Sequence, residues 1–136
     1  MKRKSFIMTA LVMMIFCVNA CAFTDVQNGS WYYDNVTDMT NQGYLSGYED
    51  GTFRPDGTVT KAELVSIVGR IAGLQESTKQ NNHWADGMVQ TALAKGLFDW
   101  DEIPPTAQTY DEPITRHLAV KIVMNAFFKE DRGDYN

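Results

Sequence analysis

The chain repeats a set of landmarks at a spacing of 53 to 55 residues, and this repeat constrains its fold more than any other feature. The repeated landmarks are Trp31 and Trp84, Gly43 and Gly96, and the tripeptides 59–61 and 114–116. A repeat of this length is typical of a supersecondary unit that buries its apolar face against its neighbours. We therefore expect two similar units that share a core.

The first unit has the pattern of helix, loop and helix. Trp31, Val36 and Met39 stand at helical spacings, and Gly43 is well placed to end that helix. The stretch 47–57 then holds three glycines and a proline in eleven residues, which predicts a turn-rich loop.

A second helix is expected to begin after Thr60. The Thr60 hydroxyl can accept from the amide of Glu63, and the Glu63 carboxylate can reach back to the amide of Thr60, which is a capping box. Gly73 is expected to end this helix. The apolar residues expected along it at helical spacing are Leu64, Ile67, Val68 and Ile71.

The second unit follows the same plan. Its first helix carries the apolar stripe Val89, Leu93 and Leu97, and the range 114–128 contains its second helix. We expect the inward side of that second helix to consist of Leu118, Ile122 and either Ala126 or Phe127. Here the capping box is broken, because Leu118 stands where Glu63 would be. The predicted fold is mainly α, with tandem helix–loop–helix repeats and short extended loop segments.

The first 22 residues have the pattern of a signal peptide. Three basic residues, 2–4, precede an apolar run at 6–18 and small residues around Cys21, which predicts export and a mature chain that starts at Phe23. An alternative is that Cys21 becomes a lipidated first residue, the one case in which we expect membrane contact. The other predicted boundaries are a first repeat at 23–74, a linker at 75–82, a degenerate second repeat at 83–128 and a polar tail at 129–136.

Charge and composition exclude several classes of function. Removal of the three basic residues of the signal peptide leaves 9 basic against 17 acidic residues, a net charge of −8 that opposes binding to nucleic acid. His83 and His117 are the only histidines, and a mature chain from Phe23 has no cysteine, so we expect no metal site and no cofactor. No motif pairs two carboxylates for hydrolysis, so we expect that the chain is not an enzyme.

The first unit resembles an S-layer homology repeat. The resemblance rests on the opening at 23–26 with the pair 31–32, on the middle at 43–48 and 50–55, and on the closing motif at 60–63. The second unit keeps its start at 84–86, Gly96 and 114–116, but lacks the glycine-rich middle.

This resemblance implies a helical protein that is exported and held at the bacterial cell wall or cell surface. It implies non-covalent anchoring through a secondary cell-wall polysaccharide, which in this family often carries pyruvate ketals. Family members often have three repeats that form a pseudo-threefold prong, with sites in the grooves between repeats. Two repeats leave open a homo-oligomer, a partial module, or a structural or protein-interaction module that has lost glycan binding.

A pyruvyl ketal presents a carboxylate and a methyl group on a sugar ring, and its binding calls for cations, amide donors and aromatic surface. The candidate glycan-binding residues are Lys61, Arg116, Arg54, Thr60, Glu63, Gly47, Tyr48 and Trp31. Where the family usually has Arg, this chain has Lys61, which keeps the charge and loses the bidentate fork. Capping alone explains Glu63, and we expect Trp31 and Trp84 to be core anchors rather than sugar platforms.

Overall fold

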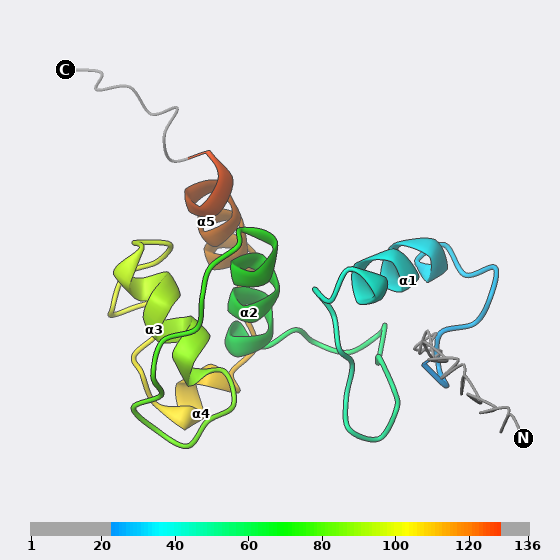
Figure 1. Ribbon diagram of the computed structural model, residues 1–136, viewed down its shortest axis with the longest axis horizontal. Coiled ribbons are helices and arrows are strands. Elements are labelled where there is room, and N and C mark those ends of the chain that lie inside the picture. Colours follow the sequence, from blue (N-terminus) through cyan, green and yellow to red (C-terminus); the bar gives the residue numbers. More distant parts are fainter. Residues whose placement is uncertain (1–22, 129–136) are drawn as a thin grey trace, which may run out of the picture.

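The computed structural model describes residues 23–128, which form a mainly helical fold as the sequence predicts (Figure 1). The helices of this range are α1 (Tyr33–Asn41), α2 (Lys61–Ile71), α3 (Asp86–Ala94), α4 (Ala107–Tyr110) and α5 (Arg116–Phe127). Extended pairing within the described range is limited to one antiparallel bridge, between Thr60 and Pro113. The predicted signal peptide, the lipidation alternative at Cys21 and the polar tail lie outside the described residues.

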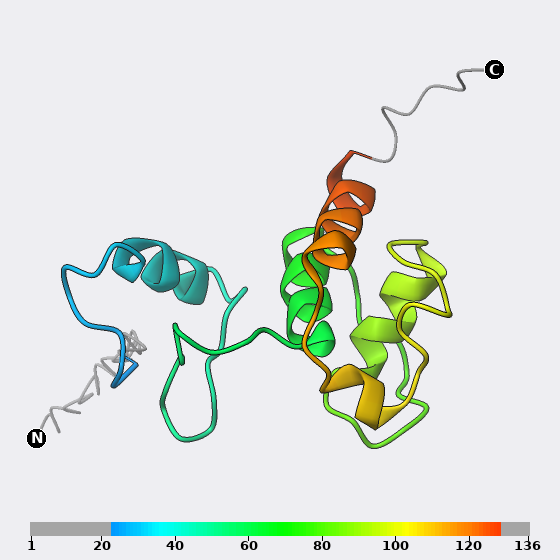
Figure 2. The same cartoon turned by 180° about the vertical axis from the view of Figure 1, so that it is seen from behind.

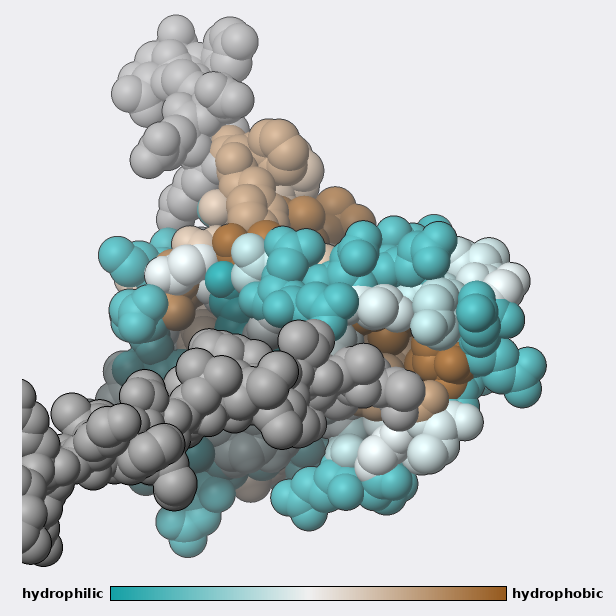
Figure 3. Space-filling model, turned by 45° about the vertical axis from the view of Figure 1, so that its right-hand side comes forward, coloured by the Kyte–Doolittle hydropathy of each residue, from teal (hydrophilic) through white to brown (hydrophobic). Residues whose placement is uncertain are grey.

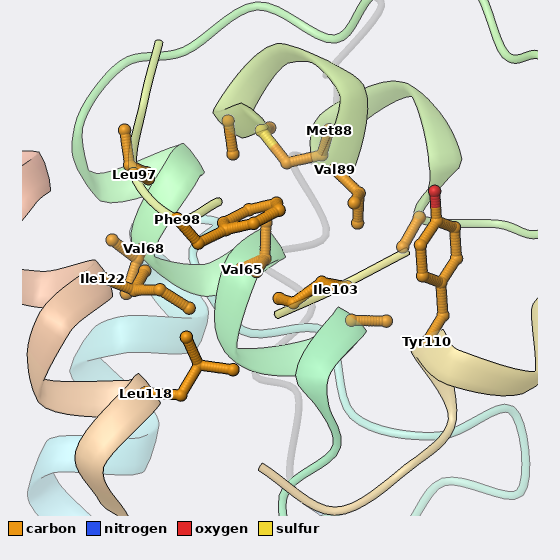
Figure 4. Close-up of a cluster of buried hydrophobic side chains, with 13 residues drawn as sticks. Val65, Val68, Met88, Val89, Leu97, Phe98, Ile103, Tyr110, Leu118 and Ile122 are labelled. Atoms are coloured by element: carbon orange, nitrogen blue, oxygen red, sulfur yellow. The ribbon is translucent and has the colours of Figure 1, made fainter. Parts of the chain in front are cut away.

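Helix α2 is the centre of the packing. The extensive helix pairs join α2 to α3, to α5 and to the short α4, and α1 takes no part in them. Figures 1 and 2 show α2, α3, α4 and α5 grouped together, with α1 and its loop set to one side. Figure 4 shows the buried side chains that these four helices and the α3–α4 loop bring together. The largest of them are Tyr110, Phe98, Met88, Ile103 and Ile122.

The core-facing side of α2 agrees with the predicted apolar residues at Leu64 and Val68 and differs from them at Ile67 and Ile71. Ala62, Val65 and Val68 are buried, whereas Ile71 is 37% exposed and Ile67 lines a surface groove. The reason is that α2 carries two apolar stripes, and α3 packs closely on the side of Gly69, where a Cβ would collide with Met88. Helical periodicity alone does not say which of two stripes a neighbour will cover. In α5 the predicted Leu118 and Ile122 are buried, Ala126 packs against the core, and Phe127 is 45% exposed.

A buried carboxylate joins α3 to α4, and the sequence did not predict it. Asp86 is fully buried and accepts hydrogen bonds from the backbone amides of Gln80 and Asn81, and from the Tyr110 hydroxyl at 2.8 Å. Burial alone would raise the pKa of Asp86, but these hydrogen bonds outweigh it and hold the pKa below its ordinary value. This network fixes the polar segment 75–82, predicted to be a linker, against the second unit.

The two units repeat each other in their hydrogen bonds. The amide of Tyr44 donates to Met39, and the amide of Leu97 donates to Ala92, after glycines with φ of +77° and +69°. The end of each second helix then holds the same backbone carbonyl. Arg70 donates to the Tyr44 oxygen at 3.3 Å, and Asn125 donates to the Leu97 oxygen at 2.9 Å. The unit boundaries 23–74 and 83–128 stay predictions.

The N-terminal part of the first unit is tied together by Asp25. Its two carboxylate oxygens accept from the backbone amides of Phe53 at 2.8 Å and Arg54 at 2.7 Å. These hydrogen bonds, above all the one from Phe53, lower the pKa of Asp25. Asp25 therefore connects the start of the first unit to the far side of its glycine-rich loop. In the described part of the chain, none of the helices has the length and apolarity needed to cross a membrane.

Candidate ligand-binding groove

A groove of about 460 Å³ lies where the loop 44–59 meets α2. The loop forms one wall, and the outward side of α2 forms the other with Glu63, Ser66, Ile67 and Arg70. Trp84, the first landmark of the second unit, also lines it. The groove is therefore lined mainly by the first predicted unit, with one residue from the second.

Glycines give the loop its path. Gly47 has a φ of +66°, and its α-carbon lies so close to the Phe23 ring that a Cβ there would collide with it. Gly51 has a φ of +78°. Side chains other than hydrogen disfavour this left-handed region, so both positions need glycine on conformational grounds. The role of Gly47 seen here is close packing on Phe23 beneath the groove.

Arg54 is held in place over an aromatic ring. Its guanidinium lies 4.0 Å from the centre of the Tyr48 ring and forms an ion pair of 2.8 Å with Asp50. Hydrogen bonds to Asp50 from Thr52, and then from Arg54, lower the pKa of Asp50 to about 2. Arg54 thus presents a pre-oriented but already partnered cation at the mouth of the groove.

Glu63 is part of the predicted capping box, which is confirmed. Its carboxylate accepts from the Thr60 amide at 2.8 Å, and its amide donates to the Thr60 hydroxyl at 3.2 Å. The second carboxylate oxygen accepts from the Tyr48 hydroxyl at 2.6 Å, which raises the pKa of Tyr48. Both oxygens of Glu63 are therefore engaged, and Glu63 fastens the loop to α2.

Two residues on the α2 wall were missed by the sequence analysis. Ser66 is 2% exposed, and its hydroxyl has no hydrogen-bond partner within residues 23–128. Arg70 donates to the Tyr44 carbonyl and at 3.4 Å to the Ser46 hydroxyl, and it pairs with no carboxylate in the described range. One available signal was a serine inside the apolar run 64–68, four residues before an arginine on the same helical face.

The other candidate residues lie elsewhere. Lys61 does not line the groove, because its ammonium forms an ion pair of 2.8 Å with Glu112 and its side chain is 13% exposed. Arg116 is exposed and takes part in no ion pair within the described range. Trp31 is 88% exposed and lies outside the groove, whereas Trp84 is 49% exposed. The interpretation of the two tryptophans as core anchors was wrong, because each precedes its helix and lies at the edge of its unit.

In the second unit, buried side chains occupy the position that corresponds to the groove of the first unit. The counterparts of Glu63 and Ile67 are Leu118 and Ile122, which are 6% and 0% exposed. The loop after α3 packs Phe98 and Ile103 into the core, and a separate hollow lies at the far end of α5 beside Leu97, Asn125 and Phe127. In this unit the loop is also held by Lys121, whose ammonium lies 2.7 Å from Asp99 and 2.8 Å from Glu102. Arg116 therefore stands beside a packed loop. No cluster of His, Cys, Asp and Glu suited to a metal ion occurs between residues 23 and 128.

The helical fold and the groove define a small module built from helix–loop–helix repeats. Residues 22–65 match the S-layer homology domain, so the chain carries such a domain in its first unit. The match covers the first unit from Phe23 to the capping box of α2, and so includes the loop wall of the groove.

Several curated proteins of bacteria are similar to this chain. A cellulosome-anchoring protein of Acetivibrio thermocellus is 30% identical over 91 residues, which are 59% of this chain and 20% of that protein. An endoglucanase of a Bacillus species (strain KSM-635) is 31% identical over 131 residues, 87% of this chain and 14% of that protein. A surface layer protein of Brevibacillus choshinensis is 28% identical over 105 residues, 74% of this chain and 9% of that protein.

The chain thus spans at most about a fifth of the length of these relatives. Two of the three are named for anchoring or for the surface layer, and the similarity to the third extends over nearly the whole of this chain. The predicted location, exported and at the bacterial cell surface, agrees with these similarities.

Proposed function

We propose that this chain is a non-catalytic module that anchors to the bacterial cell wall by binding an anionic wall polysaccharide in the groove between α2 and the loop 44–59. Wall anchoring at the general level is supported by the S-layer homology domain and by the anchoring and surface-layer relatives. The choice of an anionic sugar, such as one with a pyruvate ketal, rests on the chemistry of the groove.

The observation that carries this proposal is a pair of polar groups on the α2 wall, an unpartnered hydroxyl and a guanidinium that no carboxylate of the described range neutralises. Ser66 places a buried hydroxyl without a partner in the groove wall, and an isolated buried hydroxyl is unfavourable unless something bonds to it. Arg70, one helical turn further on, offers a guanidinium that no carboxylate of the described range neutralises. A carboxylate on a sugar ring is a good acceptor for both groups.

The remaining surface of the groove suits a sugar ring. Tyr48 and Trp84 contribute aromatic area, and sugar C–H groups pack well on such surfaces. The two acidic residues of the groove are Glu49 and Glu63, and Glu63 is occupied by its bonds to Thr60 and Tyr48. The groove therefore keeps a local cationic side although the mature chain as a whole is acidic.

The test is co-sedimentation of the exported, mature protein with purified wall sacculi, with and without their secondary polymer. Ser66→Ala is the sharpest variant, because it removes the orphaned hydroxyl and should leave stability unchanged or raised. We expect it to weaken binding about 3- to 10-fold, the equivalent of one hydrogen bond. Arg70→Gln should weaken binding about 10- to 100-fold through the loss of a charge-assisted hydrogen bond.

Lys79→Gln is the control for Arg70→Gln, because it removes one positive charge from an exposed position outside both the groove and α5 and should leave binding unchanged. Competition with soluble wall fragments, before and after mild acid removes their ketals, tests the sugar class. Equal binding by wild type and Ser66→Ala, or equal competition by both fragments, would contradict the proposal. A folded wild type that fails to sediment would favour the alternative of a structural or protein-interaction module.

A further inference from the structure

The equivalent helices α2 and α5 expose opposite sides. α2 buries Val65 and Gly69 against α3, with Val65 at 0% exposure. Fifty-five residues later, Val120 is 56% exposed and Met124 is 44% exposed. The positions through which α2 packs on α3 therefore face outward on α5, which is the counterpart of α2 in the second unit.

These residues belong to one stripe along the helix. Arg116, Val120, Met124 and Phe127 recur at intervals of four, four and three residues, and all four are exposed. Such intervals place side chains on the same face of a helix. Figure 3 shows apolar surface over the C-terminal part of α5. We call these four residues the outer face of α5.

The helix that matches this face by sequence equivalence is α1. α1 corresponds to α3, which packs on α2, yet α1 itself belongs to none of the extensive helix pairs. Figures 1 and 2 show it to one side of the other helices. Trp31, just before α1, is 88% exposed, whereas its counterpart Trp84 is partly covered where it lines the groove of the first unit.

The sizes of the equivalent contact residues are complementary. In the α2–α3 contact a glycine, Gly69, makes room for the long side chain of Met88. The equivalent positions are Met124 on α5 and Asn35 on α1, where the large residue has moved to the other partner. Asn35 is shorter than its counterpart Met88, which leaves part of the room that the long side chain of Met124 needs in such a contact.

The charges are complementary as well. α5 carries Arg116 on its outer face and no acidic residue, while its Lys121 is already paired with Asp99 and Glu102. α1 carries Asp34 and Asp38 and no basic residue. Both aspartates are exposed and stand four residues apart, on one side of the helix. Opposite charge on the exposed sides of two helices favours their association and fixes its register.

We propose that the outer face of α5 binds helix α1 of a second copy of this chain. In this contact α1 takes the place on α5 that α3 occupies on α2. The contact is heterologous, since two different surfaces meet. This inference is independent of glycan binding, because the groove is formed by α2 and the loop 44–59 and shares none of the residues of the outer face of α5.

The first experiment measures the mass of the mature, exported protein by size-exclusion chromatography with light scattering, from low to high micromolar concentration. Wild type should shift from one copy to two or more as the concentration rises. Val120→Glu/Met124→Glu should remain a single copy, and since both positions are exposed the fold should survive. Trp100→Glu, at a 60% exposed position in the α3–α4 loop, should behave as wild type.

The second experiment exchanges charges between the two helices. Asp34→Lys/Asp38→Lys and Arg116→Glu should each weaken self-association about 2- to 5-fold for every pair altered, and added salt should shrink the difference. A mixture of these two variants should associate more tightly than either alone, because each mixed contact again joins opposite charges. A wild type that stays a single copy at all concentrations would overturn the proposal, and so would a mixture no tighter than its components.

Discussion

The hydrogen bond between Tyr110 and Asp86 is the most informative single interaction to remove. The donor and acceptor are both buried and lie 2.8 Å apart, and the acceptor is an ionised carboxylate. Hydrogen bonds to charged groups contribute about 1.5 to 3 kcal/mol to stability. Tyr110→Phe removes this bond and leaves the ring in place, so cavity formation adds little. For a domain of this size the melting temperature should fall on the order of 10 °C.

The control is Tyr33→Phe, which removes a half-buried hydroxyl that bonds to nothing within the described residues. Its melting temperature should change little, within about 0.5 kcal/mol of stability. Thermal unfolding of both variants by circular dichroism at pH 7 measures the difference. Equal melting temperatures for Tyr110→Phe and wild type would refute the view that this hydrogen bond stabilises the core.

The effect of Tyr110→Phe on stability should also depend on pH. The pKa of Asp86 is lowered in the folded state, so its stabilising contribution is complete above its ordinary value of 3.8 and is lost as the pH falls through the folded value. Loss of the Tyr110 donor raises the folded pKa toward the ordinary one. The stability difference between wild type and Tyr110→Phe should therefore narrow below about pH 4. A difference that stays constant down to pH 2.5 would mean that Tyr110 acts through packing and not through the carboxylate.

Three further substitutions test other contacts. Gly69→Ala should lower stability by about 1 to 3 kcal/mol, because its methyl group meets Met88, and by less in a Met88→Ala background, as measured by a double-mutant cycle in urea. Gly47→Ala should weaken binding to wall sacculi more than it lowers the melting temperature, since it disturbs the loop beside Phe23 and not the helical core. Glu63→Ala should lower stability by about 1 kcal/mol or more and leave α2 shorter by amide hydrogen exchange, since it breaks the capping box.

The helices could be placed from the sequence because their signals are local. The capping box at Thr60 and the glycines at positions 43 and 73 act within a few residues of a helix end. The structure places α2 and α5 where these signals put them. Helix α4 was missed because it has only four residues, too few for a periodic pattern, and Tyr110 is buried through contacts 24 residues away in the chain.

The site was predictable in part for the same reason. The turn-rich loop that carries Tyr48 and Arg54 and the capping box of Glu63 were both predicted from residues 47–63, whereas the hydrogen bond from Tyr48 to Glu63 was not. The α2 wall was not predictable, since the position of Ser66 and Arg70 along the groove depends on where the loop folds back. Lys61 illustrates the limit most clearly. Its partner Glu112 is 51 residues away, and nothing near Lys61 in the sequence indicates that pairing.

Taken together, the groove and the outer face of α5 lead us to a prediction about how self-association affects binding to the cell wall. Within residues 23–128 the first unit has an open groove, while the matching position of the second unit is filled by Leu118 and Ile122. A single groove gives a monovalent contact, and linking two such grooves raises the effective affinity about 100-fold or more without any new contact to the wall. Self-association through α5 supplies such a link.

Val120→Glu/Met124→Glu should therefore bind soluble wall fragments as tightly as wild type, since its groove is intact. On intact sacculi, where many sites are displayed together, it should bind about 100-fold more weakly at concentrations at which wild type is associated. Trp100→Glu should match wild type in both assays. If the double variant lost affinity for the soluble fragment as well, its defect would lie in the groove or the fold, and the link between association and anchoring would fail.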